Sequence, residues 1–447
     1  MNQTIKIKKG LDIPLGGMAE RVIVDARSIG RYAVKPPDVV GFMPRLLVAE
    51  GETVEAGQPL VADKNDPRLT LPSPVAGTVT AIVRGEKRRL EAVVVESGKW
   101  KVENNATQDG NSRLSTSLFP LSASAPVWWM LRERPFGTIA NPDHKPKGIY
   151  VSLRDTNPLA PDLDFALRGR EHDFEAGIKA LETLGEVHCV RAEGPHPAGN
   201  IGTIVAALDP INKGERIWHA GAQDVATIGH WVLTGEYRPE RLVAVGGPAA
   251  KAPHYYRLLC GACLQRITDA QMMDCNYPSL STFHFPLSTR IISGSPLSGT
   301  TVAADGFLGM YDQQVTFIEE GDQYDFMGWL MPGLKKFSFS KTFLSGFARL
   351  LPTAHYPLPT QFNTNLHGSV RPFLFTGQFE RVFPMDIYPL QLIKACIVGD
   401  VELQEKLGIY EVEPEDFALC EFIDPSKTEI QTIIREALEL LRKEATA

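Results

Sequence analysis

The chain has 447 residues, and its 46 basic and 53 acidic side chains give a formal net charge of -7. This length predicts about three domains, and the charge excludes a protein that binds nucleic acid through a large basic surface. The 38 glycines and 33 prolines exceed average usage, so short strands and turns should outweigh long helices. The composition therefore argues against an all-helical bundle.

Three sequence features bear on the cellular location. No segment approaches the ~18 consecutive apolar residues of a membrane span. The early lysines Lys6, Lys8 and Lys9 lead into Gly10 instead of an apolar run, so no secretory signal is expected. The 6 cysteines are too sparse for a disulfide framework. We expect a cytoplasmic protein with no direct insertion into the membrane.

Residues 1–103 show short strand patterns separated by glycine and proline. Segment 78–83 alternates in part and segment 92–95 is a short apolar run, both typical of half-buried strands. With its glycine-punctuated turns, this region resembles a biotinyl/lipoyl-type barrel. Lys64 lies near the hairpin where such domains carry a covalent cofactor, but its turn runs into Pro67. We interpret Lys64 as a solvated lysine, with a biotin- or lipoyl-carrying protein as an alternative.

Residues 104–126 have the composition of a linker. Residues 127–255 then alternate between strand and helix patterns as the apolar period changes from 2 to 3.6. We predict a Rossmann-like α/β domain with a mostly parallel sheet. Its expected strands are 149–153, 187–190, 216–219 and 242–247, and its expected helices contain 174–184 and 225–233.

Strand patterns return in residues 256–330, notably at 290–299 and 314–318, which predicts a small β-grasp-like module. Residues 331–447 are expected to form a C-terminal helical domain. Its last segment, 429–444, places its apolar residues on one stripe and predicts an amphipathic closing helix. The fold class expected for the whole chain is a multidomain α/β protein.

Cys260 and Cys263 have the spacing of a redox pair or of half a zinc site. A structural zinc needs four ligands, and the nearest candidates, His254, Cys275 and His284, have no regular spacing. We interpret the pair as two small buried thiols. No metal site is predicted.

The loop 194–203 is the most specific local motif. Two prolines flank His196, and three glycines allow backbone N–H groups to approach a ligand. Because the loop follows a predicted strand, it falls where α/β sheets bind ligands, although a rigid connecting loop explains it equally well. The sequence contains neither G-x-G-x-x-G nor a Walker A motif, which speaks against a standard dinucleotide or nucleoside triphosphate site.

Several motifs together resemble a known family. Segments 128–161 and 217–225, the His196 loop, and segments 292–299 and 381–387 resemble the A subunit of the sodium-translocating NADH:quinone reductase. That family is similar in turn to the C subunit of the Rnf complex and to the flavin-bearing subunit of respiratory complex I. The motifs keep their order along nearly the whole chain.

The resemblance also shows which cofactor ligands are missing. The relatives hold FMN in a loop of the form G-A-G-F-P, where this chain has Arg134-Pro135-Phe136-Gly137, so bulky side chains replace glycines that approach a flavin phosphate. The Rnf relative binds iron–sulfur clusters through cysteine runs. The matching segments here, 381–384 and 420–427, keep one cysteine between them, which cannot hold a cluster. We expect neither flavin nor iron–sulfur cluster.

The resemblance implies a peripheral subunit on the cytoplasmic side of the bacterial inner membrane. It implies quinone as a ligand or substrate, and integral membrane and flavin-carrying subunits as partners. The alternative is a free-standing oxidoreductase that binds flavin or NADH itself. A quinone needs an apolar slot with donors to its carbonyls, although the tryptophans suit an ordinary core as well. The candidate residues are Trp128, Trp129, Phe136 and His144 in one cluster, and His196 and His219 in another.

Overall fold

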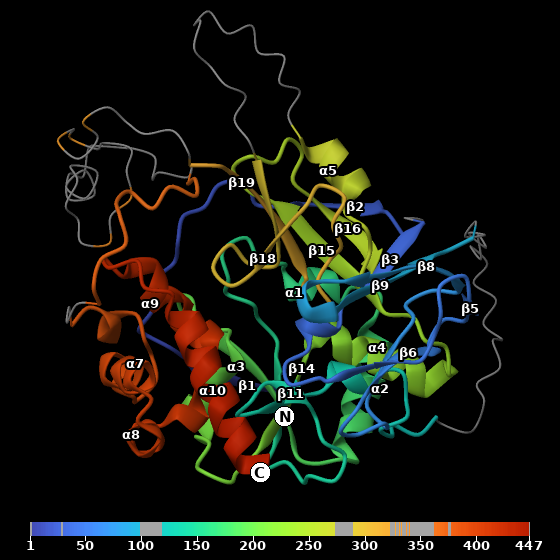
Figure 1. The fold of residues 1–447 in the computed structure, drawn as a ribbon, viewed down its shortest axis with the longest axis horizontal. Helices are drawn as coiled ribbons and strands as arrows, with labels where there is room; N and C mark the ends of the chain where they lie inside the picture. The colour runs from blue at the N-terminus through green and yellow to red at the C-terminus, as the bar shows by residue number, and fades with distance from the viewer. Residues whose placement is uncertain are drawn as a thin grey trace, which may run out of the picture.

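The computed structural model describes residues 2–27, 30–98, 119–272, 289–321, 327, 330, 332, 337, 339, 362–373 and 377–446. These residues form an N-terminal β unit, two six-stranded sheets and a group of C-terminal helices. The β unit and the C-terminal helices lie on opposite sides of the molecule (Figure 1), with the two large sheets between them.

The β unit covers residues 31–96 and consists of two small antiparallel sheets, ordered β3-β9-β8-β5 and β4-β6-β7. The strands predicted at 78–83 and 92–95 are confirmed as parts of β8 and β9. Side chains that alternate into the interior, such as Val79, Val93 and Val95, are fully buried. The bounds are β3 (Arg31–Val34), β4 (Pro44–Leu46), β5 (Thr53–Val54), β6 (Pro59–Asp63), β7 (Thr70–Pro72), β8 (Gly77–Arg84) and β9 (Leu90–Glu96).

Sheet A has the order β1-β13-β12-β14-β10-β11. Its first four strands run parallel, and β10 and β11 add an antiparallel edge. The strands predicted within 149–153, 187–190 and 216–219 are confirmed. The bounds are β1 (Asn2–Lys6), β10 (Arg132–Arg134), β11 (Thr138–Ile139), β12 (Ile149–Ser152), β13 (Val187–Glu193) and β14 (Ile217–Gly221).

Helices cover both faces of sheet A. Alternate strand residues pack on α3 (Ile201–Leu208) on one face, and the others join the core under α2 (Glu171–Glu182) and α4 (Ala222–Thr234). Gly229 lets α2 and α4 touch through their backbones, because a Cβ there would lie 1.7 Å from the carbonyl oxygen of Asp173. The helices predicted within 174–184 and 225–233 are therefore confirmed, and glycine sets how closely they pack.

Sheet B has the order β18-β17-β19-β15-β16-β2. The strand expected at 242–247 is predicted to belong to the parallel sheet of the α/β domain, and this assignment is wrong. It forms β15, which pairs antiparallel with β16 and parallel with β19. The bounds are β2 (Glu20–Asp25), β15 (Glu240–Gly246), β16 (His254–Leu259), β17 (Thr289–Ser293), β18 (Thr300–Val302) and β19 (Gln314–Glu319), with α1 (Leu163–Ala166) and α5 (Gln265–Gln271) nearby in the chain.

The pairings of β1, β2 and β15 differ from the predicted domain boundaries. Strands β1 and β2, within the predicted barrel 1–103, pair with β13 of sheet A and β16 of sheet B instead. The predicted boundary at residue 255 falls inside β16, so the strands of 256–330 share one sheet with β15. Of the predicted linker, residues 119–126 are described, and Phe119 packs against Trp231 with ring centroids 5.8 Å apart.

The C-terminal helices enclose a core of their own, to which Phe383, Phe417 and Leu438 belong. The predicted closing helix is confirmed as α10, whose apolar stripe is buried. Among the described residues, no helix has the length and apolar character to cross a bilayer. The bounds are α7 (Pro389–Val398), α8 (Val401–Lys406), α9 (Ala418–Ile423) and α10 (Ile430–Thr446), with a 3-10 turn at Pro414–Phe417.

Candidate functional site

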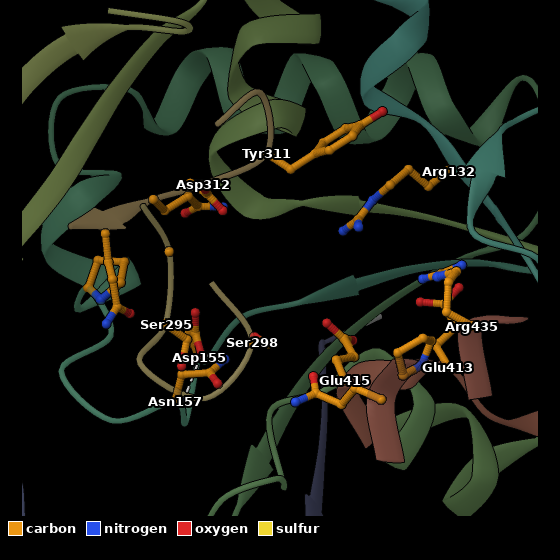
Figure 2. Close-up of a pocket in the computed structure, with 16 residues that line it drawn as sticks. Arg132, Asp155, Asn157, Ser295, Ser298, Tyr311, Asp312, Glu413, Glu415 and Arg435 are labelled. Atoms are coloured by element: carbon orange, nitrogen blue, oxygen red, sulfur yellow. Dashed lines mark hydrogen bonds between the residues drawn. The ribbon is translucent and has the colours of Figure 1, made fainter. Parts of the chain in front are cut away.

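A cavity of about 350 Å³ lies where the carboxyl end of β12, the loops flanking β17 and β19, and the C-terminal helices meet. Asp155 follows β12, Ser295 follows β17, and Glu415 lies in the 3-10 turn before α9. Figure 2 shows the Arg132 guanidinium and the Glu415 carboxylate pointing into the space between these elements. The carboxyl ends of parallel strands are the usual place for ligands in α/β sheets.

A buried ion pair forms the base of this region. Arg134 is fully buried, and its Nη2 donates to Oδ2 of Asp416 at 2.7 Å, while its Nε lies 3.5 Å from Oε1 of Glu413. Asp416 Oδ2 also accepts from the backbone N–H of Glu413 at 2.9 Å, as part of a capping box. The pair joins β10 of sheet A to the C-terminal unit across 282 residues of sequence. Removal of the Arg134 charge would leave the Asp416 carboxylate buried without its counter-charge.

Glu415 carries the ionisable group best placed for proton exchange. Burial, together with the neighbouring Asp416 and Glu413 charges, raises the pKa of its carboxyl to about 7, against the opposing effect of Arg132 and Arg134. A carboxyl with this pKa is partly protonated near neutral pH. It can therefore both donate and accept a proton toward a ligand in the cavity.

Two more carboxyls line the cavity from the sheets. Asp155 accepts from the backbone N–H and the side-chain amide of Asn157, each at 2.9 Å, and Asp312 accepts from the Ser293 hydroxyl at 2.6 Å. Burial raises the pKa of both carboxyls, against those hydrogen bonds. Acidic groups thus outnumber the basic ones in the lining.

Cationic donors approach the cavity from two sides. The Arg132 guanidinium lies over the Tyr311 ring, with its Cζ 4.7 Å from the ring centroid, a favourable cation–π geometry. The Tyr311 hydroxyl donates to the carbonyl oxygen of Trp129 at 2.9 Å, which fixes the ring. Arg435, on α10, donates to the carbonyl oxygen of Phe136 at 3.2 Å. The cavity can therefore donate hydrogen bonds to a neutral carbonyl compound from fixed positions.

The structure links two of the predicted quinone residues through other side chains. His144 Nδ1 lies 3.0 Å from both carboxylate oxygens of Glu133, and the same carboxylate accepts from Nε1 of Trp218 at 3.0 Å. Trp218 in turn makes an edge contact with Trp128, with ring centroids 5.7 Å apart. Trp128 is buried and donates to the carbonyl oxygen of Ala140, so this group is a polar cluster at the edge of sheet A.

Trp129 and Phe136 are placed in two different cores. Trp129 donates to the Tyr237 hydroxyl at 3.2 Å and packs near Tyr311. Phe136 packs with the C-terminal core and makes an edge contact with Tyr410, with ring centroids 6.5 Å apart. The predicted cluster of these aromatics with His144 is therefore divided among three environments.

The histidines of the second predicted cluster are both buried. His196 donates its backbone N–H to Asp12 at 3.0 Å, its Nδ1 lies 3.4 Å from the Thr156 hydroxyl, and its Nε2 has no partner. His219 pairs with Arg132 in the strand register and has no partner at either ring nitrogen. Burial lowers the pKa of His196 to about 4 and lowers that of His219 as well. Both rings are neutral at physiological pH.

The remaining motifs show no further site in the described part of the chain. Cys260 and Cys263 are buried and free, in agreement with the prediction. No group of three potential metal ligands occurs among the described residues, and Cys275 and His284 lie outside them. Lys64 directly follows β6 and is exposed.

Sequence reasoning missed the charged groups of the cavity. It places Glu413, Glu415 and Asp416 only within a helical domain, and it treats Arg134 only as an obstacle to flavin. The sequence signal that could have indicated these groups is the set of three acidic residues around Pro414, which lies beside an apolar segment. Its partner Arg134 could not be identified, because local sequence carries no information on a contact 282 residues away.

Comparison with known proteins gives family matches to both N-terminal regions. The model for the NqrA N-terminal barrel-sandwich hybrid domain matches residues 5–98, and the model for the NqrA second alpha/beta domain matches 121–193 and 183–237. A solved structure, the air-oxidised NAD+-reducing [NiFe]-hydrogenase, matches at TM-score 0.31 and 11% identity, over 67% of this chain and 55% of that chain.

Curated relatives match over the full length. The chain is 35% identical to the A subunit of the Na(+)-translocating NADH-quinone reductase of Rhodopirellula baltica, over 98% of each chain. It is 35% identical to that of Pasteurella multocida and 34% identical to that of Yersinia pseudotuberculosis, over 98% of this chain and 100% of each relative. The chain therefore belongs to the family formed by the A subunits of Na+-translocating NADH-quinone reductases.

Proposed function

We propose that this chain works as a peripheral subunit of a sodium-translocating NADH:quinone reductase on the cytoplasmic side of the bacterial inner membrane. The observation that carries this proposal is 35% identity over 98% of both chains with a relative that bears that name. Its partners are the integral membrane and flavin-carrying subunits of the complex. Within this proposal, the N-terminal barrel is biotinyl/lipoyl-like, the α/β domain Rossmann-like and the strands of 289–319 β-grasp-like.

The cavity is the proposed place for the quinone headgroup. Arg132 and Arg435 supply donors to the two carbonyl oxygens, and Glu415, with a pKa of about 7, supplies a group that can exchange protons as a quinone becomes a quinol. The alternative placement is the His196 loop, where the buried Nε2 atom without a partner also suits a carbonyl oxygen or a hydroxyl.

The same cavity argues against a flavin of the chain's own. The Glu413–Asp416 turn places carboxyls beside the segment Arg134–Gly137, where the relatives' loop is expected to bind a flavin phosphate. A Cβ on Gly137 would lie 3.0 Å from Oε1 of Glu413, so this loop is already packed against a carboxylate. A phosphate dianion would be repelled there. These residues do not fit FMN.

A quinone titration of the purified chain tests the placement. Arg132→Gln should weaken binding by about tenfold or more, because it removes a charged donor worth ~1.5–3 kcal/mol. Arg84→Gln, at an exposed position of the β unit, is the control and should bind as the native chain does. If His196→Ala weakens binding by ~1–3 kcal/mol and Arg132→Gln does not, the site belongs at the His196 loop. Unchanged affinity in both variants would disprove a quinone site in either place.

A flotation assay tests the mode of attachment. The isolated chain should stay in the soluble fraction, since its net charge of -7 opposes adsorption to anionic lipid. It should float only with vesicles that contain the integral subunits of the reductase. Strong binding to protein-free vesicles would contradict attachment through partners.

A further inference from the structure

A second cavity, of about 280 Å³, lies between the α1–α2 loop, α4 and the strands β15 and β16. No residue of its lining belongs to the lining of the first cavity. It is lined by five arginines but by only two carboxylates, Asp173 and Glu240. We call this site the arginine pocket, after Arg27, Arg168, Arg170, Arg238 and Arg257.

Glu240 is the acceptor on which most of these arginines converge. Its carboxylate lies 3.3 Å from Nη1 of Arg27, 3.0 Å from Nη2 of Arg238 and 3.3 Å from Nε of Arg257. Its backbone carbonyl oxygen accepts from Arg170 at 3.1 Å. A single carboxylate therefore faces three guanidinium groups. It is also well shielded, with its side chain only 14% exposed.

Two other carboxylates of the region are already engaged. Asp25 pairs with Arg27, and Asp173 lies 3.5 Å from Nδ1 of His230. Each guanidinium carries five N–H donors, so donors exceed the available acceptors. The Nε of Arg238 is buried and has no partner. Positive charge confined in this way attracts an anion, because like charges in a partly buried site repel.

The start of α2 borders the arginine pocket. Gly169 and Arg170 line the pocket immediately before Glu171, the first residue of the helix, and a helix N-terminus carries partial positive charge. Backbone N–H groups of Glu171 and Gly169 lower the pKa of the Glu171 carboxyl. The N-terminus of α2 is therefore already engaged by the Glu171 carboxyl, and the arginines are the groups left to hold a further anion.

We propose that the arginine pocket binds a phosphate group, with Glu240 as an internal anion that partly takes its place when the pocket is empty. Arginine forks match the oxygens of phosphate in a bidentate manner, and phosphate brings more charge than a carboxylate. The volume of about 280 Å³ accommodates an inorganic phosphate or a diphosphate. The source is either a soluble phosphate compound or a phospholipid headgroup, since Ile23, which is 42% exposed on the edge strand β2, lines the same pocket.

Calorimetric titration of the full chain with pyrophosphate at constant ionic strength tests the proposal. Arg257→Gln and Arg238→Gln should each weaken binding about tenfold, and Arg257→Lys should restore part of the affinity. Arg89→Gln is the matched control, because Arg89 lies outside the pocket and its side chain is 64% exposed. Glu240→Gln should bind pyrophosphate more tightly than the native chain, because the competing carboxylate is gone.

Thermal unfolding shows whether each variant is folded, so that a loss of affinity is not mistaken for a loss of structure. Since a ligand that binds the native state raises its stability, pyrophosphate should raise the Tm of Glu240→Gln more than that of the native chain. Vesicles of phosphatidic acid, compared with phosphatidylcholine alone, test the lipid source: binding that depends on Arg257 assigns the phosphate to a lipid headgroup, and it would at the same time overturn the proposed attachment through partners alone. The proposal is overturned if pyrophosphate and phosphatidic acid both fail to bind, or if Arg257→Gln and Arg89→Gln bind them equally.

Discussion

Arg134 makes the most deeply buried charged contact described between sheet A and the C-terminal unit. It is fully buried, it pairs with Asp416 at 2.7 Å, and two of its nitrogens have no hydrogen-bond partner. A buried ion pair of this kind is a weak source of net stability but is costly to break. Its value lies in fixing one arrangement of the two units, and with it the wall of the cavity.

Replacement of Arg134 by alanine should destabilise the chain by ~3–5 kcal/mol, because the Asp416 carboxylate would stay buried without a counter-charge. The double variant Arg134→Met/Asp416→Leu should lose less, since it removes both charges. Urea denaturation measures both effects, and Arg84→Ala serves as the exposed control. A loss below ~1 kcal/mol for Arg134→Ala, typical of exposed pairs, would show that the pair is solvated.

Glu415 should make the stability of the chain depend on pH in a definite direction. Burial raises the pKa of Glu415 from 4.5 to about 7, so between these values the native state holds a proton that the unfolded chain releases. The free energy of unfolding therefore falls as pH rises through this window. Glu415→Gln stays neutral and should remove this part of the fall, a gain of about 2 kcal/mol at pH 8 relative to pH 5.

Denaturation curves at pH 5, 6, 7 and 8 measure this difference. The native chain and Glu415→Gln should have nearly equal stability at the acid end and diverge toward pH 8. Parallel curves over the whole range would mean that Glu415 titrates as it does in the unfolded chain.

At the scale of elements, α3 and the Pro414–Phe417 turn approach each other closely at one glycine, Gly202. A Cβ on Gly202 would lie 2.3 Å from Oδ2 of Asp416 and 2.5 Å from Nη1 of Arg134. The first turn of α3 therefore rests directly on the buried ion pair. This close contact between α3 and the ion pair requires a residue without a side chain at position 202.

Gly202→Ala should destabilise the chain by ~1–3 kcal/mol through overpacking, although alanine is the better helix former by about 1 kcal/mol. Gly185→Ala is the control, because its Cβ would meet nothing closer than 3.4 Å. Thermal unfolding distinguishes the two. Equal Tm values would show that α3 can move away from the turn without cost.

The elements themselves were largely predictable, whereas their partners were not. A period of 3.6 identified α2 and α10, because each buries one stripe, and partial alternation identified β8, whereas β9, β12 and β13 were identified as short apolar strand segments. Strand β15 shows that the apolar pattern of a strand does not identify the sheet to which it belongs. It is apolar on both faces, so its pattern suits any central strand position, and only the tertiary fold assigns it to sheet B.

The site illustrates the same boundary. His196 stands out in the sequence because prolines flank it and glycines lie close to it. Its burial and its Nε2 atom without a partner are consistent with the hypothesis of a ligand-binding loop. The arginines and carboxyls of the two cavities come from distant segments, and single charged residues on separate elements have no local pattern. Sequence could therefore indicate the family and the edge of the sheet but not the chemistry of the lining.

For the molecule as a whole, the carboxyl-lined cavity predicts a chain without absorbance above about 350 nm, since neither flavin nor iron–sulfur cluster should bind. A visible spectrum of the purified chain, with acid extraction and flavin fluorescence, measures this. Replacing Glu413 and Glu415 by glutamine lowers the negative charge of the cavity. The spectrum of this double variant, compared with that of the native chain, shows whether the two carboxylates are what excludes a flavin. Stoichiometric flavin in the native chain would favour the free-standing oxidoreductase.

The strands β1 and β2 impose an order on how this chain can fold as it leaves the ribosome. The strands of the β unit pair with one another within residues 31–96, apart from an isolated bridge between Tyr32 and Ala262, so most of that unit can close early. Lys6, in contrast, pairs with Glu193, and Asp25 pairs with Arg257. At roughly 5–20 residues per second, the first strand must wait on the order of 10 to 40 s for its partner. During that time the backbone N–H and C=O groups of β1 in the nascent chain have no strand partner. The lysines at the end of β1 and just after it provide positive charge that discourages association of this strand with other chains.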